Sequence, residues 1–176
     1  FSRDFYEICM NSNIRFIYAS SASVYGLGEN GFRVNKKCEN PINAYAFSKL
    51  SFDNYVRYKV KNKNNVVGLR YFNVFGPGEE HKGNMASTMF HFNNQVISRG
   101  YVELFGAHDN YAEGEQRRDF IYIDDIVRLI LWSAFDYKKG GIFNAGTGIS
   151  RTFNDVAKSV LLYHRKPVST ETLRYI

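Results

Sequence analysis

Two short, largely apolar runs limit how this chain can fold. They cover Ile14–Ala19 and Val66–Tyr71, and neither alternates strictly between apolar and polar residues. Such runs are typical of strands in a parallel sheet, which is covered on both faces. The segment from Asn43 to about Lys61 lies between them and carries apolar residues at helical spacing. The sequence therefore predicts a strand, a helix and a second strand in an α/β layered fold.

The same alternation continues toward the C-terminus. The spacing of apolar residues predicts further short strands over 102–105, 120–123 and 142–145. It predicts helices over 1–10, 85–99 and 124–137, and a last helix that begins at Thr152. This order of elements is that of an α/β domain rather than of an all-helical or all-strand fold.

The composition excludes several classes of protein. Hydrophobic residues make up 44% of the 176 residues, which is enough for a compact core and argues against a disordered chain. The net charge of +6 is spread along the chain without a basic stripe or a nucleic-acid-binding motif, so we expect no nucleic acid partner. The most apolar stretch, Ile121–Phe135, contains charged residues and is shorter than a membrane helix, so we expect no membrane segment.

The cysteines indicate the compartment of the chain, and the first residue bears on its N-terminus. Cys9 and Cys38 are far apart and have no metal-ligand spacing, so the sequence predicts neither a disulfide framework nor a metal site. A reducing cytoplasm is therefore the expected compartment. Because the chain begins with Phe1 rather than Met, we expect that sequence upstream of it is missing.

One glycine motif has to be weighed as a phosphate-binding loop. Gly26, Gly28 and Gly31 match the GxGxxG pattern of dinucleotide-binding turns. That function requires a helix to start at the glycines, so that its N-terminus meets the pyrophosphate. Residues 32–38 have no helical period, so we expect a plain surface loop here. Any phosphate loop would then lie outside these 176 residues.

A tyrosine and a lysine on the central helix could act as a catalytic pair. Tyr45 and Lys49 are four positions apart, so they share one face of the helix. An ammonium beside a tyrosine stabilises the phenolate and so makes the tyrosine a better base. The serines at the end of the first strand, Ser20, Ser21 and Ser23, could share the substrate oxygen, because ligands bind at the carboxyl ends of strands in open α/β sheets.

Five motifs follow one another along the chain: IYASSASVYG, NAYAFSK, GLRYFNVFGPG, RRDFIYIDDIV and FNAGTG. Together they resemble the extended short-chain dehydrogenase/reductases that act on nucleotide sugars. Within that superfamily, EEHKGNMAS and SKLSFDNYV resemble the ADP-heptose 6-epimerases, and the resemblance extends from Phe16 to about His164. It implies the C-terminal portion of a Rossmann-type parallel sheet with part of a small α/β substrate lobe.

The resemblance also implies a division of the chain. Residues 1–77 and 119–148 would be the remnant of an NAD(P)-binding Rossmann domain, and residues 78–118 and 149–176 part of the sugar-nucleotide lobe. The phosphate loop and the residue that selects NAD or NADP would lie upstream of Phe1. The full-length enzyme would be a homo-oligomer.

The family's catalytic positions fall on four residues. Ser21 would hydrogen-bond the substrate, Tyr45 would be the first acid/base, and Lys49 would bind the nicotinamide ribose and tune Tyr45. Both Tyr45 and Lys49 would contact the cofactor, and Lys82 would be the second acid/base. The implied reaction epimerises ADP-D-glycero-manno-heptose to its L-glycero epimer by transient oxidation and re-reduction with bound NADP, with NAD as the alternative cofactor. Two acid/base groups are needed because the intermediate is reduced on its opposite face.

The family's binding positions fall on five more residues. Val74 would contact the cofactor. Asn73, His91 and Phe105 would contact the ADP-sugar substrate. Arg118 would bind its diphosphate, for which a planar guanidinium offers two parallel donors.

Each role has a plainer alternative. Lys82 could be a solvated loop charge, His91 a partly exposed helix histidine, and Arg118 one half of a surface basic pair with Arg117. For the whole chain, the alternatives are another nucleotide-sugar epimerase or dehydratase of the same superfamily, or a truncated remnant that keeps the motifs without catalysis.

Overall fold

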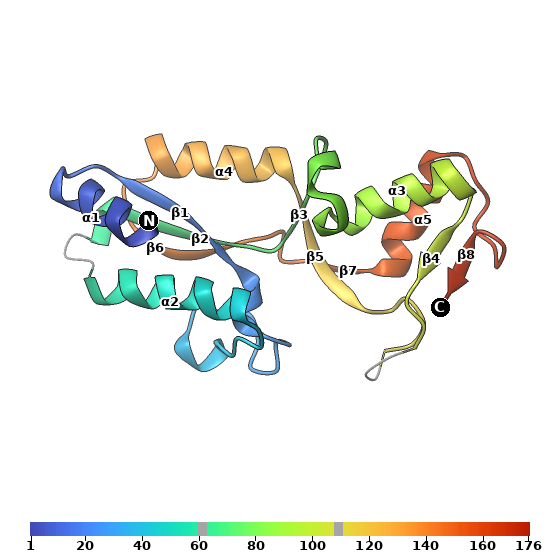
Figure 1. Ribbon diagram of the computed structural model, residues 1–176, viewed down its shortest axis with the longest axis horizontal. Helices are drawn as coiled ribbons and strands as arrows, with labels where there is room; N and C mark the ends of the chain where they lie inside the picture. The colour runs from blue at the N-terminus through green and yellow to red at the C-terminus, as the bar shows by residue number, and fades with distance from the viewer. Residues whose placement is uncertain (60–62, 108–110) are drawn as a thin grey trace. The chain divides into compact units, whose positions relative to one another are not determined.

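The computed structural model describes residues 1–59, 63–107 and 111–176. They form two compact units (Figure 1). Unit 1 contains residues 1–72 and 124–145, and unit 2 contains residues 73–123 and 146–176. Parallel strands and helices occur in both units, which confirms the predicted α/β class.

The units divide the chain at slightly different points from those expected. The boundaries expected after residues 77, 118 and 148 instead fall after residues 72, 123 and 145. The physical reason is strand pairing. Strand β3 (Asn73–Phe75) pairs in parallel with β5 (Arg117–Tyr122), so both strands belong to the sheet of unit 2.

Unit 1 is built on a three-stranded parallel sheet. Its strands β1 (Phe16–Ser21), β2 (Val66–Tyr71) and β6 (Gly141–Ala145) lie in the order β1-β2-β6. Phe16 lies opposite Val66, and Val67 opposite Gly141. The helices of this unit are α1 (Ser2–Asn11), α2 (Ala44–Lys59) and α4 (Ile123–Phe135).

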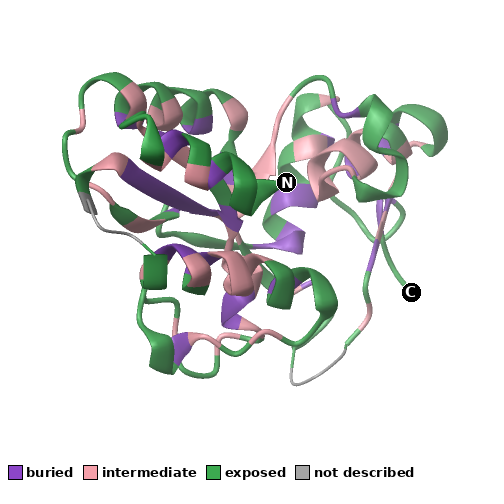
Figure 2. Cartoon of the chain, turned by 60° about the vertical axis from the view of Figure 1, so that its left-hand side comes forward, coloured by how far each residue is buried: buried purple, intermediate pink, exposed green. Residues whose placement is uncertain are grey.

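Helices cover both faces of this sheet, as its apolar strands require. One face packs against α1 and α2 through a buried cluster of Tyr6, Cys9, Phe16, Tyr18, Val56 and Val66. Helix α4 runs along the other face (Figure 1). Strand β2 is buried over its first five residues, and Figure 2 colours it accordingly. Covering on both faces explains why β1 and β2 are apolar without alternation.

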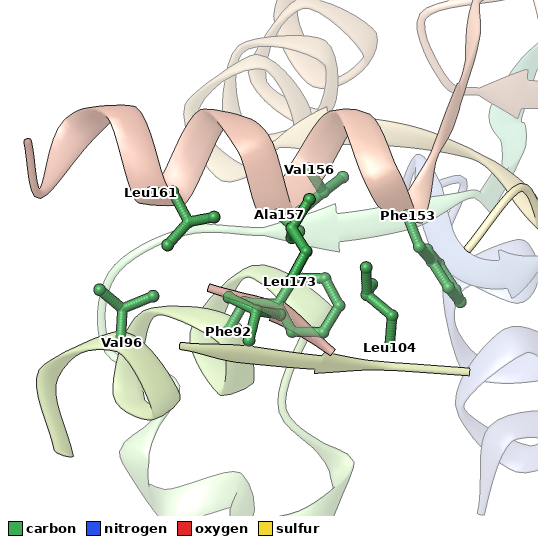
Figure 3. Packing of buried hydrophobic residues seen from close by; sticks show 9 residues of the cluster. Phe92, Val96, Leu104, Phe153, Val156, Ala157, Leu161 and Leu173 are labelled. Atoms are coloured by element: carbon green, nitrogen blue, oxygen red, sulfur yellow. The ribbon is translucent and has the colours of Figure 1, made fainter. Parts of the chain in front are cut away.

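Unit 2 has two small sheets and two long helices. One sheet contains β3, β5 and β7 (Ser150–Thr152), and the other contains β4 (Val102–Leu104) and β8 (Leu173–Tyr175). The helices are α3 (Thr88–Arg99) and α5 (Phe153–Tyr163). Figure 3 shows side chains of α5 pointing toward those of α3, β4 and β8. The buried cluster that they form consists of Phe92, Val96, Val102, Leu104, Phe153, Val156, Ala157, Leu161 and Leu173.

Local hydrogen bonds fix where these helices begin. The Ser87 hydroxyl accepts from the Phe90 amide at the start of α3. Thr152 and Asp155 form a capping box at the start of α5. Short 3-10 helices complete the chain: η1 (Ala22–Tyr25), η2 (Lys36–Cys38), η3 (Lys63–Asn65) and η4 (Glu80–Met85).

Most predicted elements are present, with shifted ends. The first strand begins at Phe16 instead of Ile14, and the helix expected from Met85 begins at Thr88, because Ser87 caps it. The expected end of α2 at Lys61 lies outside the described residues. The sequence analysis missed β3, β7 and β8, which have three residues each.

The glycine-rich loop is confirmed as a plain loop. Gly26, Gly28 and Gly31 all have positive φ, as turns require, and residues 26–35 contain turns, bends and irregular backbone without a helix or strand. The first regular structure that follows is the three-residue η2. Within residues 1–59, 63–107 and 111–176, no helix combines the length and the apolar character that crossing a bilayer requires.

Candidate functional site

Ser21 lies at the carboxyl end of β1, where the strand turns into η1. Its hydroxyl caps η1 by accepting from the Ser23 amide (3.2 Å) and from the Ser23 hydroxyl (2.9 Å). The Ser21 hydroxyl hydrogen is not used in these bonds. Ser21 can therefore donate to a ligand oxygen at the end of the strand.

Tyr45 and Lys49 lie on the first turns of α2 and are brought together. The Lys49 Nζ is 5.6 Å from the centroid of the Tyr45 ring, and it donates to the Ala19 carbonyl at 3.1 Å. Ala19 is two residues before Ser21 on β1. The Tyr45 side chain is 57% exposed, so a ligand can reach it. The ammonium is thus fixed between the end of β1 and the face of the tyrosine ring.

A buried carboxylate fixes the helix that carries this pair. Asp53 lies one turn beyond Lys49 on α2 and is fully buried. It accepts from the Tyr18 hydroxyl (2.9 Å) and the Ser20 hydroxyl (3.0 Å) of β1. It also accepts from Arg70 of β2 at 2.9 and 2.7 Å. These bonds tie α2 to the two strands whose carboxyl ends form the candidate site.

The network continues to Glu39. This carboxylate accepts from Arg70 at 2.6 Å and from Arg57 at 2.6 and 2.8 Å. Burial alone would raise the pKa of Glu39, but the hydrogen bonds and charges of Arg57 and Arg70 outweigh it, so the pKa is lowered. Burial and the neighbouring Asp53 raise the pKa of Tyr18. Glu39 is therefore ionised and Tyr18 is neutral at pH 7.

Sequence reasoning missed this network, although one signal was present. Arg70 interrupts the apolar run that became β2, and it is fully buried. A buried arginine needs a buried carboxylate partner. The run alone therefore implied an acidic residue facing β2, which is Asp53.

Unit 2 holds a pocket that collects three of the predicted site residues. Asn73, Val74 and Lys82 line it. The pocket has a volume of about 220 Å³. Its other lining residues are Glu79, Met85, Ala86, Ser87, Thr88 and Phe120.

Lys82 is paired with a buried carboxylate in this pocket. Its Nζ is 3.3 Å from the Glu79 Oε2, and its side chain is 42% exposed, whereas that of Glu79 is 4% exposed. The neighbour of Lys82 is thus a carboxylate, and the Lys82 side chain is half-exposed. This ion pair places the Lys82 amine at the pocket, where a ligand oxygen could meet it.

Of Asn73 and His91, only Asn73 lines the pocket. Asn73 is exposed at the start of β3, and its amide donates to the Asp119 carbonyl at 3.2 Å. His91 lies on α3, one turn after Thr88, so the two share a helix face. His91 itself does not line the pocket, although Thr88 does.

Phe105 and Arg118 both contact the side chain of Phe153. The Phe105 ring centroid is 6.1 Å from that of Phe153, and the Arg118 Cζ is 5.9 Å from the Phe153 ring. Phe105 is 63% exposed and Arg118 is also exposed. The Arg118 Nη1 donates to the Arg117 carbonyl at 2.7 Å. An exposed aromatic ring and an exposed guanidinium beside one shared side chain suit a base and a phosphate. The sequence analysis did not single out Phe153.

The described residues fit the nicotinamide end of a dinucleotide. The hydroxyls of Ser21 and Tyr45 and the amine of Lys49 are donors suited to a ribose and to a reacting oxygen. The glycine-rich loop offers no helix N-terminus for a pyrophosphate, because residues 26–35 contain no helix.

Comparison with known proteins bears on these features. A sequence model of the NAD dependent epimerase/dehydratase family matches residues 2–146. The curated ADP-L-glycero-D-manno-heptose-6-epimerase of Alkalilimnicola ehrlichii is 49% identical over 162 residues, which are 92% of this chain and 50% of that protein.

Two solved structures are also similar. The Helicobacter pylori ADP-L-glycero-D-manno-heptose-6-epimerase is 33% identical with a TM-score of 0.82, covering 98% of this chain and 51% of that one. The UDP-N-acetylglucosamine 4-epimerase of Methanobrevibacter ruminantium is 28% identical with a TM-score of 0.83, covering 99% and 54%. The chain thus spans about half the length of these relatives. Because the family's sequence model matches most of its residues, the chain belongs to the NAD dependent epimerase/dehydratase family.

Proposed function

We propose that this chain carries the acid/base machinery of an ADP-heptose 6-epimerase. The observation that carries the proposal is the arrangement of Tyr45 and Lys49 at the carboxyl end of β1, with the Lys49 Nζ held 5.6 Å from the Tyr45 ring centroid. The 49% identity to a curated relative of that name favours an ADP-heptose over other nucleotide sugars. Activity is expected when the segments that the longer relatives possess are supplied.

The residues divide the proton transfers between them. When the substrate alcohol is oxidised, Tyr45 takes the hydroxyl proton while Ser21 donates a hydrogen bond to the same oxygen. Lys49 stabilises the phenolate that accepts this proton. After the intermediate rotates to present its opposite face, Lys82 donates a proton to the carbonyl oxygen and then takes up another from solvent.

The cofactor is assigned by the same proposal. Bound NADP, with NAD as the alternative, supplies the reversible two-electron oxidation of the alcohol. Tyr45, Lys49 and Val74 are the residues of this chain that would contact it. Asn73, His91 and Phe105 would contact the ADP-sugar, and Arg118 its diphosphate, for which its exposed guanidinium beside Phe153 is suited. The working enzyme is proposed to be a cytoplasmic homo-oligomer.

The first experiment is calorimetric titration of the chain with NADP and, separately, with NAD. Saturable binding that is lost in Lys49→Ala would support the cofactor assignment. Lys158→Ala, which removes an exposed lysine on α5, is the matched control and should bind as the unmodified chain does. Absence of binding to either dinucleotide would favour the truncated-remnant alternative.

The second experiment supplies the chain with the segments that its longer relatives possess and measures turnover of ADP-D-glycero-manno-heptose by NMR detection of the C6 epimer. Tyr45→Phe removes the acid/base group, so the rate should fall by about 10²- to 10⁴-fold. Tyr58→Phe is the matched control, because Tyr58 lies on the same helix and is 86% exposed. Equal rates for Tyr45→Phe and Tyr58→Phe would contradict the assignment.

A variant of the second acid/base separates the related activities. Lys82→Met should abolish epimerisation of the ADP-heptose while leaving NADP binding intact. Turnover of a UDP- or dTDP-sugar that is indifferent to Lys82→Met would instead support another epimerase or dehydratase of the superfamily.

A further inference from the structure

The pocket of unit 2 contains a buried carboxylate that has no role in the mechanism above. Glu79 is 3% exposed and lies between β3 and η4. A buried glutamate is costly unless its oxygens accept hydrogen bonds. Its partners therefore indicate what it does.

Four donors meet the two oxygens of Glu79. Oε1 accepts from the Gly76 amide (3.2 Å) and the Ser87 hydroxyl (2.7 Å). Oε2 accepts from the Ser87 amide (2.8 Å) and the Lys82 ammonium (3.3 Å). Every partner is a donor, so the geometry suits the ionised carboxylate. One side chain thus connects the end of β3, the turn η4 and the cap of α3.

The charge of Glu79 agrees with this geometry. Burial would raise its pKa, but the donations from Ser87, Gly76 and Lys82 outweigh burial and lower it. Three of its four hydrogen bonds do not involve Lys82. The carboxylate is therefore fixed by the backbone and by Ser87, independently of Lys82, whose side chain is 42% exposed.

We infer that Glu79 is a positioning residue: it holds the Lys82 amine at the pocket. The inference rests on the proposed function in taking Lys82 as the second acid/base, but the ion pair can be tested without substrate. An amine that is held in place can transfer its proton along a fixed direction.

The test measures how fast the Lys82 amine is acylated by an N-hydroxysuccinimide ester, by peptide mass spectrometry on the intact chain. The exposed Lys37 serves as the internal reference. Glu79→Gln removes the charge, so the rate at Lys82 relative to Lys37 should rise about two- to fivefold, the range expected for a half-exposed ion pair. Glu80→Gln, an exposed neighbour outside the pocket lining, should leave the ratio unchanged.

Two further measurements separate positioning from a general loosening of the loop. Ser87→Ala removes one hydrogen bond to Glu79 but keeps the charge, so the acylation ratio should stay near that of the unmodified chain. Salt screens ion pairs, so raising it should increase the ratio in the unmodified chain and have little effect in Glu79→Gln. The salt series on the unmodified chain remains informative even where Glu79→Gln does not fold.

The inference is overturned if Glu79→Gln leaves the acylation ratio unchanged, if Ser87→Ala raises it as much as Glu79→Gln does, or if the unmodified chain shows no salt response.

The rate of turnover gives a separate test. Glu79→Gln should lower kcat for the ADP-heptose with little change in KM, because the proton donor is misplaced while the binding residues remain. Absence of turnover when the segments of the longer relatives are supplied, with the expected acylation results, would reject the proposed function and leave the role of Glu79 in place.

Discussion

Each unit of the molecule contains an ion pair built on a buried carboxylate, and the two pairs differ in their cation. In unit 1, Asp53 is paired with Arg70, and both side chains are fully buried. In unit 2, Glu79 is paired with Lys82, whose side chain is 42% exposed. The carboxylates are similar in burial, so the difference lies in whether solvent or a ligand can reach the positive partner.

This difference separates two uses of the same interaction. A fully buried arginine that meets Asp53 and Glu39 is available to nothing else, so its charge serves to fix α2 on β1 and β2. A half-exposed lysine can leave its carboxylate for a ligand. The degree to which the cation is buried therefore indicates which pair is structural and which is available for chemistry.

The largest expected effect comes from breaking the buried pair. Asp53→Ala leaves the Arg70 charge buried beside a single remaining carboxylate, and losing one partner of a buried pair costs about 3–5 kcal/mol of unfolding free energy. Urea denaturation followed by Trp132, the single tryptophan, reports on this, because Trp132 lies on α4 in unit 1. Asp125→Asn, which breaks an exposed pair on the same helix α4, is the control and should change stability by less than about 1 kcal/mol. Similar losses for the two variants would mean that burial of the pair is not what matters.

Acidification is expected to have a smaller effect on the unfolding free energy. The lowered pKa of Glu39 means that its contribution to stability is fully present above the ordinary glutamate pKa of about 4.3 and is lost as the pH falls through the lower, folded-state value. The difference in unfolding free energy between the unmodified chain and Glu39→Gln should therefore be constant near neutral pH and shrink below about pH 4. Urea midpoints across this range measure it. A difference that grows on acidification would contradict the ionised state of Glu39.

The smallest effect on stability is expected from breaking the half-exposed pair. Lys82→Met leaves Glu79 with its bonds from Gly76 and Ser87, so the unfolding free energy should change by less than about 1 kcal/mol. Differential scanning calorimetry is the measurement, and the same variant should lose epimerase turnover. A large loss of stability would mean that Lys82, like Arg70, serves to stabilise the fold and not to react.

The layered fold could be predicted because apolar periodicity is a local property. Strand β2 has the predicted ends, Val66 and Tyr71, and the capping box at Thr152 marks the start of α5. Strands β3, β7 and β8 could not be predicted, since three residues are too few to show a period. Their partners in the sheets lie far away along the chain, as Val102 and Leu173 show.

The candidate site was predictable only in part for the same reason. Tyr45 and Lys49 are close because of helix geometry, which the spacing of four already encodes. The meeting of Lys82 with Glu79 depends on the turn η4, in which Gly83 has a positive φ that breaks the helix. The apolar run around Arg70 did carry a signal for Asp53, but the spacing of 17 positions gives no local rule that identifies the partner.

Phe153 belongs both to the buried core of unit 2 and to a group of side chains at its surface. It is 8% exposed within the nine-residue cluster of unit 2, and it also contacts the exposed Phe105 and Arg118. Substitutions that repack this core therefore also alter the contacts of the exposed Phe105 and Arg118. A change from Phe153 to a smaller residue would alter the support of both neighbours, so the hydrophobic interior of unit 2 sets how finely its proposed nucleotide contacts can be tuned.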